Sequence, residues 1–226
     1  MVEIVFVRHG QPEWTKDDLN VVDPPLTELG QEQAQAMADA LAGEHFDEVF
    51  CSPLTRARQT AAPLFAALGR EETVAPWLEE IGDPDWHGTP ASMAQAAFEE
   101  LMARPVDERW HGLEGGESIR DFQNRIRSGG EAFWAERGMQ RTADLLPIWK
   151  IAEPGARIAL VAHIGTNSVA IGHLLGLEST PWEWDRFVLN HASISRVEAL
   201  EVHDGHTFSL TKLSDVEHLD PVQRTR

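Results

Sequence analysis

Short apolar runs alternate along the chain with segments whose apolar residues recur at helical spacing. The runs at 4–7, 47–52 and 157–162 are predicted to be buried strands. Helices are predicted where apolar side chains recur every three or four residues and a glycine follows, over 27–43, 53–68, 117–133 and 167–175. This alternation predicts an α/β fold, a three-layer sandwich with a mostly parallel sheet and helices on both faces.

The rest of the sequence predicts an antiparallel edge to the sheet and two insertions. Two strand-like segments, 193–202 and 207–213, flank Asp204-Gly205, a strong turn signal, and predict an antiparallel hairpin at the edge of the sheet. Segments 82–116 and 138–155 lack a clear pattern and are predicted to be insertions over or beside the sheet, the first a lid with a helix at 92–103. Gly129-Gly130 predicts a kink or break in the helix that contains it. We expect one domain over residues 1–226.

Composition narrows the class of protein further. The formal net charge is −18 and no basic tract offsets it, which argues against nucleic acid and anionic membranes as partners. A single cysteine, Cys51, excludes an internal disulfide framework and favours a reducing, cytoplasmic compartment. We expect no secretory leader, because the chain starts directly in a strand-like run, and no apolar run is long enough to span a membrane. Composition leaves the oligomeric state open.

Polar side chains with catalytic potential follow the predicted strands. Arg8-His9-Gly10 ends the first strand, and His163 ends the strand at 157–162. Arg56 lies just inside the helix that follows the strand at 47–52. Because the carboxyl ends of parallel strands meet at one edge of a sheet, these side chains are expected to lie together. A lone histidine at a strand end is more often structural, but a histidine beside fixed cations suits attack on a phosphoryl group.

The same segments resemble the histidine phosphatase superfamily, also called the phosphoglycerate mutase-like family, over nearly the whole chain. The matching segments, in order, are Arg8-His9-Gly10, Pro25–Gln31, Ser52–Ala57, Gly115–Ser118, His163 and Ala192–Ile194. The resemblance implies that His9 is a nucleophile that is phosphorylated and then dephosphorylated, with no metal and no cofactor. It implies a small phosphorylated metabolite as the ligand.

Roles for the other residues follow from the resemblance and from their chemistry. Arg8 and Arg56 are expected to bind the phosphoryl oxygens through planar paired donors, and His163 to act as an added cation whose pKa rises against a dianionic phosphate. The family's acidic residue precedes an isoleucine-like position and lies six residues before Trp and eight before Gly. Glu80 fits that register, so we predict Glu80 rather than Glu79 as the proton donor.

Two departures from the family pattern bear on the site. Ile164 stands between His163 and Gly165, where relatives usually have glycine directly after the histidine. After the first motif, relatives often carry a Ser or Thr and then an Asn, where this chain has Pro12 and Thr15. Thr15 is predicted to offer its hydroxyl to the phosphate, with Gln11 as a possible substitute donor. Trp86 and Trp110 are candidates for an apolar wall over the leaving group.

The predicted function is hydrolysis of a small phosphomonoester through a phosphohistidine on His9. A phosphoglycerate mutase is the first alternative, but it would need extra cations for a carboxylate substrate, and segment 82–116 offers only Arg104 and Arg109. A catalytically weak binding or regulatory protein is the second alternative, which the departures at positions 12, 15 and 164 keep open. The sequence does not identify the substrate.

Overall fold

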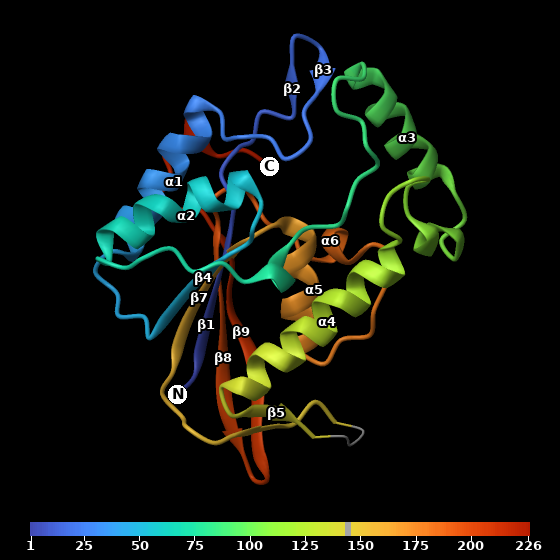
Figure 1. Ribbon diagram of the computed structural model, residues 1–226. Coiled ribbons are helices and arrows are strands. Elements are labelled where there is room, and N and C mark those ends of the chain that lie inside the picture. The colour runs from blue at the N-terminus through green and yellow to red at the C-terminus, as the bar shows by residue number, and fades with distance from the viewer. Residues whose placement is uncertain (143–145) are drawn as a thin grey trace.

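Three parallel strands form one side of the sheet in the computed structural model, which describes residues 1–142 and 146–226 (Figure 1). Strand β7 (Arg157–Ala162) lies between β4 (Glu48–Cys51) and β1 (Glu3–Arg8), and both neighbours pair with it in parallel. Each of these strands is short and apolar, as expected for strands covered on both faces. Their carboxyl ends therefore meet at one edge, where Arg8 ends β1.

Antiparallel strands extend the sheet on the far side of β1. Strand β8 (Ile194–Val202) pairs with β1, and β9 (Gly205–Asp215) pairs with β8 as the predicted hairpin. Two short strands, β6 (Trp149–Ile151) and β5 (Met139–Arg141), complete the order β4-β7-β1-β8-β9-β6-β5. Segment 138–155 thus lies beside the sheet and widens it, with residues 143–145 outside the described part. The predicted α/β class is confirmed, with a longer antiparallel edge than one hairpin.

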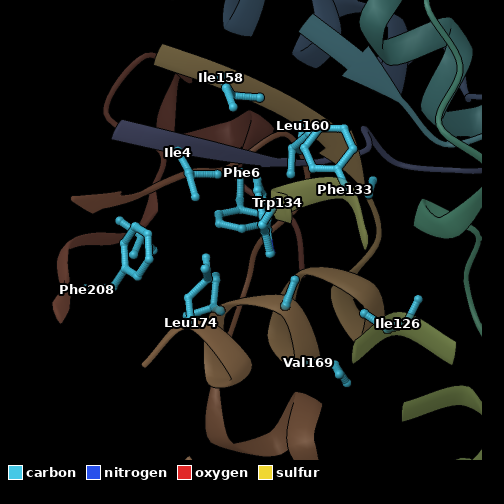
Figure 2. Packing of buried hydrophobic residues seen from close by; sticks show 14 of the residues in the cluster. Ile4, Phe6, Ile126, Phe133, Trp134, Ile158, Leu160, Val169, Leu174 and Phe208 are labelled. Atoms are coloured by element: carbon cyan, nitrogen blue, oxygen red, sulfur yellow. The ribbon is translucent and has the colours of Figure 1, made fainter. Parts of the chain in front are cut away.

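Helices cover both faces of the sheet. On one side α1 (Glu28–Leu41) and α2 (Thr55–Ala67) pack together, and on the other lie α4 (Ile119–Glu136) and α5 (Ile164–Leu174), with the short α6 (Glu183–Arg186) against α5 (Figure 1). Strand β1 contributes side chains to the cores on both faces of the sheet, because successive side chains of a strand point to opposite faces. Val5 and Val7 join the cluster with α1 and α2. Ile4 and Phe6 point the other way, toward side chains of α4 and α5 such as Ile126 and Leu174 (Figure 2).

Helix boundaries follow the predictions with two differences. Thr27 caps α1 and Ser118 caps α4, each by accepting a backbone N–H through its side chain. Helix α4 is continuous through Gly129-Gly130, so the predicted kink or break is wrong. Helix α5 begins at Ile164 rather than at 167, with His163 as its N-cap residue in extended backbone. The helix therefore starts directly at the strand end that carries the histidine.

Segment 82–116 lies beyond the carboxyl ends of the parallel strands. It contains α3 (Ala91–Ala103), whose only buried residue is Leu101, and the 3-10 helix η2 (Glu108–His111). A small hairpin of β2 (Thr15–Lys16) and β3 (Leu19–Asn20), which the sequence did not indicate, bridges to Pro90 at the start of α3. Two further 3-10 helices are η1 (Pro76–Leu78) and η3 (Pro221–Gln223). Within the described residues, no helix has the length and apolar character needed to cross a membrane.

Candidate active site

His9 stands at the end of β1, with its backbone held from two sides. Its N–H donates to Ala162 O of β7 at 2.9 Å, and its carbonyl accepts from Ala192 N at 3.1 Å. The ring is buried, and its Nδ1 lies 2.7 Å from Gly10 O. A carbonyl can only accept, so Nδ1 carries the hydrogen and the lone pair remains on Nε2. Burial, with His163 and the two arginines nearby, holds the pKa of His9 well below its usual range, so the ring is neutral and nucleophilic.

Gly10 fixes the turn that follows the nucleophile. Its N–H donates to Thr60 Oγ1 at 2.9 Å, and the same hydroxyl donates to Arg56 O at 2.7 Å. A Cβ on Gly10 would overlap the carbonyl oxygen of Gly30 in α1. Glycine is therefore required because the turn after β1 passes close to α1, and Thr60 connects this turn by hydrogen bonds to the helix that bears Arg56.

Arg8 is buried beside His9 and held by two acceptors. Nη1 donates to Leu189 O at 2.5 Å, and Nη2 lies 3.1 Å from Nε2 of His191. An arginine can only donate, so His191 accepts at Nε2 and donates through Nδ1 to Thr225 Oγ1 at 2.9 Å. Burial and Arg8 lower the pKa of His191 to about 3, which keeps this acceptor neutral. The arrangement orients one guanidinium toward the site.

Arg56 is supplied by the first turn of α2. The residue at the N-cap of α2, Leu54, has no capping side chain, and Asp23 takes this role from a distant loop. Its two carboxylate oxygens accept from the Thr55 N–H at 2.7 Å and the Thr55 hydroxyl at 2.6 Å. Asp23 Oδ1 also lies 3.8 Å from Arg56 Nη1, and the guanidinium stacks 4.8 Å from the ring centre of Trp14. Both contacts hold a buried arginine in place.

His163 lies next to His9, with ring centroids 5.1 Å apart, and is fully buried. Its Nε2 is 2.7 Å from Ser52 Oγ, and that hydroxyl accepts from Leu54 N at 3.4 Å. Ser52 can therefore donate to Nε2, which leaves Nδ1–H as a donor. Burial, followed by Arg56 and Arg8, holds the pKa of His163 well below its usual range, so the ring is neutral here. The expected rise against a bound dianion stays a prediction.

Glu80 faces these groups from the loop after η1. Its Oε2 accepts from Gly165 N at 2.9 Å and its Oε1 from Ile81 N at 3.0 Å. A Cβ on Gly165 would overlap this carboxylate, so the glycine that follows Ile164 serves to admit Glu80. Arg56 and Arg8 lower the pKa of Glu80, as do the two backbone donors. Burial raises it and outweighs the backbone donors and both arginines, which favours the protonated acid.

Three buried polar atoms at the site have no hydrogen-bond partner among the described residues. They are Nε of Arg8, Nε of Arg56 and Nδ1 of His163. Buried donors without partners are costly, and their grouping on three residues around His9 is unusual. Each can donate, so an anion of phosphate size bound here would satisfy donors from three separate segments of chain.

These residues open into a cavity of 540 Å³. Arg8, His9, Arg56 and Glu80 line it, while His163 lies beneath its surface beside His9. Thr15 does not reach the cavity, because it is exposed in β2 opposite Asn20. Thr15 thus lies apart from the cavity that the other predicted site residues line or adjoin.

Gln11 and Pro12 serve the fold rather than the site. The side-chain oxygen of Gln11 accepts from the Thr27 hydroxyl at 2.9 Å, and Pro12 bridges to Leu26. Neither residue lines the cavity. Of the two predicted wall residues, Trp86 lines it, whereas Trp110 stacks on Arg120 at 4.5 Å from its ring centre.

Sequence reasoning missed several residues of the site. Ser52, Asp23 and His191 act by holding His163, Arg56 and Arg8, and nothing local in the sequence indicated these pairs. Asp83 was also missed. It lines the cavity, and burial with the neighbouring Glu80 raises its pKa to about 6. A carboxylate three residues after Glu80 in the same loop was the available signal.

A metal site would need a cluster of ligating side chains, and the histidines closest in sequence in the described part of the chain are His203 and His206. No group of three or more His, Cys, Asp or Glu side chains there has the geometry to hold an ion. His203 and His206, at the tip of the β8–β9 hairpin, form no such group with their neighbours.

Comparison with known proteins gives one consistent result. The sequence profile of the histidine phosphatase superfamily (branch 1) matches residues 4–215. The chain is 33% identical over 131 residues to phosphoserine phosphatase 1 of Hydrogenobacter thermophilus, covering 56% of this chain and 62% of that protein. It is 38% identical over 132 residues to a 2,3-bisphosphoglycerate-dependent phosphoglycerate mutase of Sinorhizobium fredii, covering 54% and 62%. The alignment thus spans less than two thirds of either relative.

The fold comparison extends over nearly all of the chain. The structure of a mycobacterial glucosyl-3-phosphoglycerate phosphatase with inorganic phosphate aligns with a TM-score of 0.70 and 25% identity. The alignment covers 96% of this chain and 99% of that one. The predicted resemblance is confirmed.

Proposed function

Because the chain belongs to the histidine phosphatase superfamily (branch 1), we propose that it hydrolyses a small phosphomonoester through a phosphohistidine on His9. The observation that carries this proposal is the hydrogen bond of His9 Nδ1 to Gly10 O, which leaves Nε2 as a free lone pair among buried cationic donors. Relatives that are phosphatases and a relative that is a mutase both agree with phosphoryl transfer.

In the first step, His9 Nε2 attacks phosphorus in line and the bond from phosphorus to the ester oxygen breaks. Arg8 and Arg56 neutralise the charge on the phosphoryl oxygens, and His163 Nδ1–H donates to them. Protonated Glu80 gives its proton to the departing alcohol oxygen. The raised pKa of Glu80 supports this role.

In the second step, a water molecule attacks the phosphohistidine. Glu80, now a carboxylate, takes a proton from that water, and the bond from Nε2 to phosphorus breaks. Inorganic phosphate leaves, and both His9 and Glu80 return to their starting protonation states. Two in-line transfers on one set of positioned groups thus complete the hydrolysis.

The test is turnover of p-nitrophenyl phosphate and of an alkyl phosphate, with rapid quenching in alkali to trap an acid-labile phosphoryl label on the protein. His9→Ala should abolish turnover and label. His203→Ala is the matched control, since that side chain is 99% exposed, and it should behave like the wild type. Turnover in His9→Ala equal to that of the wild type would contradict the nucleophile.

Glu80→Gln separates the acid from the nucleophile. Loss of the acid should slow turnover of the alkyl phosphate by about 10²- to 10⁴-fold. The initial burst of p-nitrophenol should survive, because p-nitrophenolate leaves without a proton. Equal burst rates for both esters in the variant would remove Glu80 from the role of proton donor.

Mutase activity and a purely binding role receive less support from the cavity. A mutase substrate carries a carboxylate, yet the cations that line the cavity within the described residues are Arg8 and Arg56 alone. Arg104 and Arg109 donate to carbonyls of Gly112 and Met102 instead. Conversion of 3-phosphoglycerate without phosphate release would favour the mutase, and no turnover of any monoester would favour the binding role.

A further inference from the structure

The part of the cavity beyond the phosphate-binding groups is lined by aromatic side chains. Trp86 and Phe98 meet there edge to face, with ring centroids 5.9 Å apart. They come from the loop after Glu80 and from α3, so both belong to segment 82–116. Trp14 and Trp184 add two more ring surfaces from other segments. Four rings around one cavity favour a flat apolar group.

Two of these rings are exposed although they are large and apolar. Trp14 and Phe98 are each 45% exposed. The ring of Trp14 stacks on Arg56, which places an apolar wall directly beside the predicted phosphoryl site. An apolar group attached to the phosphate oxygen would cover these surfaces and gain from leaving water.

Acidic side chains border the same region. Asp23, Glu79 and Asp83 line the cavity beside Glu80, and of these Asp23 already pairs with Arg56. Within the described residues of its lining, the cations are Arg8 and Arg56, and both belong to the phosphoryl site. A second anionic group on the substrate would therefore face carboxylates with no further cation of the described lining to pair with, and close like charges disfavour its binding.

We propose that the substrate is a phosphomonoester of a hydrophobic, ring-bearing alcohol that carries no carboxylate and no second phosphate. The ring lies between Trp14, Trp86 and Phe98, and Asp83 favours a hydroxyl or a positively charged substituent at its far end. Phosphoglycerates and phosphoserine, which carry a carboxylate and no ring, are poor substrates in this assignment. The inference rests on the proposed phosphatase function and specifies its substrate class.

The test compares three phosphate esters whose alcohols share one 2-phenylethyl skeleton. They are 2-phenylethyl phosphate and its derivatives with a 4-carboxylate or a 4-aminomethyl group on the ring. The substituents lie too far from the alcohol oxygen to alter its acidity much, so differences in kcat/KM report contacts with the far end of the substrate. We expect the carboxylate to lower kcat/KM about tenfold or more relative to the unsubstituted ester. The aminomethyl ester should equal or exceed the unsubstituted one.

Single substitutions test which residues disfavour the carboxylate and which favour the aromatic ring of the substrate. Asp83→Asn should narrow the gap between the carboxylate and aminomethyl esters. Phe98→Ala should reduce the preference for 2-phenylethyl phosphate over ethyl phosphate by about five- to tenfold, because the ring loses an apolar contact. Leu200→Ala is the matched control, since Leu200 is 46% exposed on β8. It should leave both ratios unchanged.

The outcomes distinguish this inference from the function on which it rests. Turnover that favours 3-phosphoglycerate or the carboxylate ester, and that His9→Ala abolishes, overturns the substrate class and leaves the phosphatase intact. Absence of turnover on every ester overturns the phosphatase itself. Preferences that match expectation but persist in both Asp83→Asn and Phe98→Ala also overturn the assignment, because the selectivity then arises elsewhere.

Discussion

At the scale of single residues, the site depends on backbone groups as much as on reactive side chains. Glu80 accepts one hydrogen bond from its neighbour Ile81 and one from Gly165 at the start of α5. The second bond fixes the carboxyl relative to His163, which caps that helix. Ile164, which departs from the family pattern, only displaces the glycine by one position. In this chain the backbone N–H of Gly165 donates to the carboxyl group of Glu80.

Gly165→Ala should impair catalysis without unfolding the protein. The new methyl group would overlap the Glu80 carboxylate, which can rotate away because it is the flexible end of a side chain. We expect a loss of kcat on alkyl phosphates approaching that of Glu80→Gln and a thermal midpoint close to that of the wild type. Measuring both on one preparation checks this. Full activity, or a large loss of stability, would contradict the assigned contact.

His191 offers a second prediction, as a positioning residue for Arg8. Its Nε2 accepts from Arg8 Nη2. His191→Leu removes that acceptor and should weaken competitive inhibition by inorganic phosphate about tenfold, since hydrogen bonds to charged groups are stronger than neutral ones. His191→Gln retains an acceptor oxygen and should restore part of the affinity. Equal inhibition constants for the two variants would indicate a merely structural role.

At the scale of elements, the two glycines of α4 show why local pattern misled. A Cβ on Gly129 would lie 2.5 Å from Trp77 Cβ, so the glycine allows the helix to approach η1 closely. A Cβ on Gly130 would meet the Nε1 of Trp134 at 3.3 Å. The pair therefore serves packing between elements, and the helix stays continuous because its buried face, with Phe122, Ile126 and Phe133, packs into the core.

Gly129→Ala should destabilise the protein, and Gly130→Ala should cost less. The first change pushes against the base of the Trp77 side chain, which cannot move without its backbone, so a loss of about 1–3 kcal/mol is expected. In the second, the tight contact is offset by up to about 1 kcal/mol of gained helix propensity. Urea unfolding of both variants measures the difference. The reverse order would contradict the packing argument.

The elements predicted correctly are those whose sequence pattern extends over several residues. Strands β1 and β7 and the hairpin β8–β9 were readable because apolar runs and the Asp204-Gly205 turn carry their own signal. Within the site, Arg8, His9, Arg56 and His163 converge as the strand ends implied, and Glu80, chosen by the register of the family motif, lies beside them. The short strands β5 and β6 were not predicted, since three residues give no period. Contacts such as Ser52 with His163 arise from tertiary packing alone.

At the scale of the whole molecule, buried histidines couple stability to pH. His9, His163, His173 and His191 are all buried, and the pKa of each is lowered with burial as the largest cause. In the unfolded chain they titrate near pH 6.5. Between that pH and their folded pKa, the unfolded state binds more protons, so acid destabilises the fold. Glu80 and Asp83, whose pKa values are raised, act in the opposite direction.

The contribution of one buried histidine to the pH dependence of stability can be measured at His173, because this residue lies on α5 outside the cavity lining. Its ring packs edge to face on Trp149, both ring nitrogens lack hydrogen bonds among the described residues, and burial, then Arg127 and Arg141, lowers its pKa to about 4. The carboxylate of Glu131 lies 3.5 Å from its Nε2.

Folding must therefore release the His173 proton between pH 6.5 and about 4, which removes about 1.4 kcal/mol of stability for each pH unit of acidification. His173→Leu should flatten the dependence of the unfolding free energy on pH by this amount within that window and leave it unchanged above pH 7. Urea titrations at pH 7, 6 and 5 measure it. The fully exposed His203 provides the control, since His203→Leu should leave the slope as it is. If the unfolding free energies of His173→Leu and the wild type vary in parallel with pH, His173 has the same pKa in the folded and unfolded states. The acid sensitivity would then come from the other buried histidines, His9, His163 and His191.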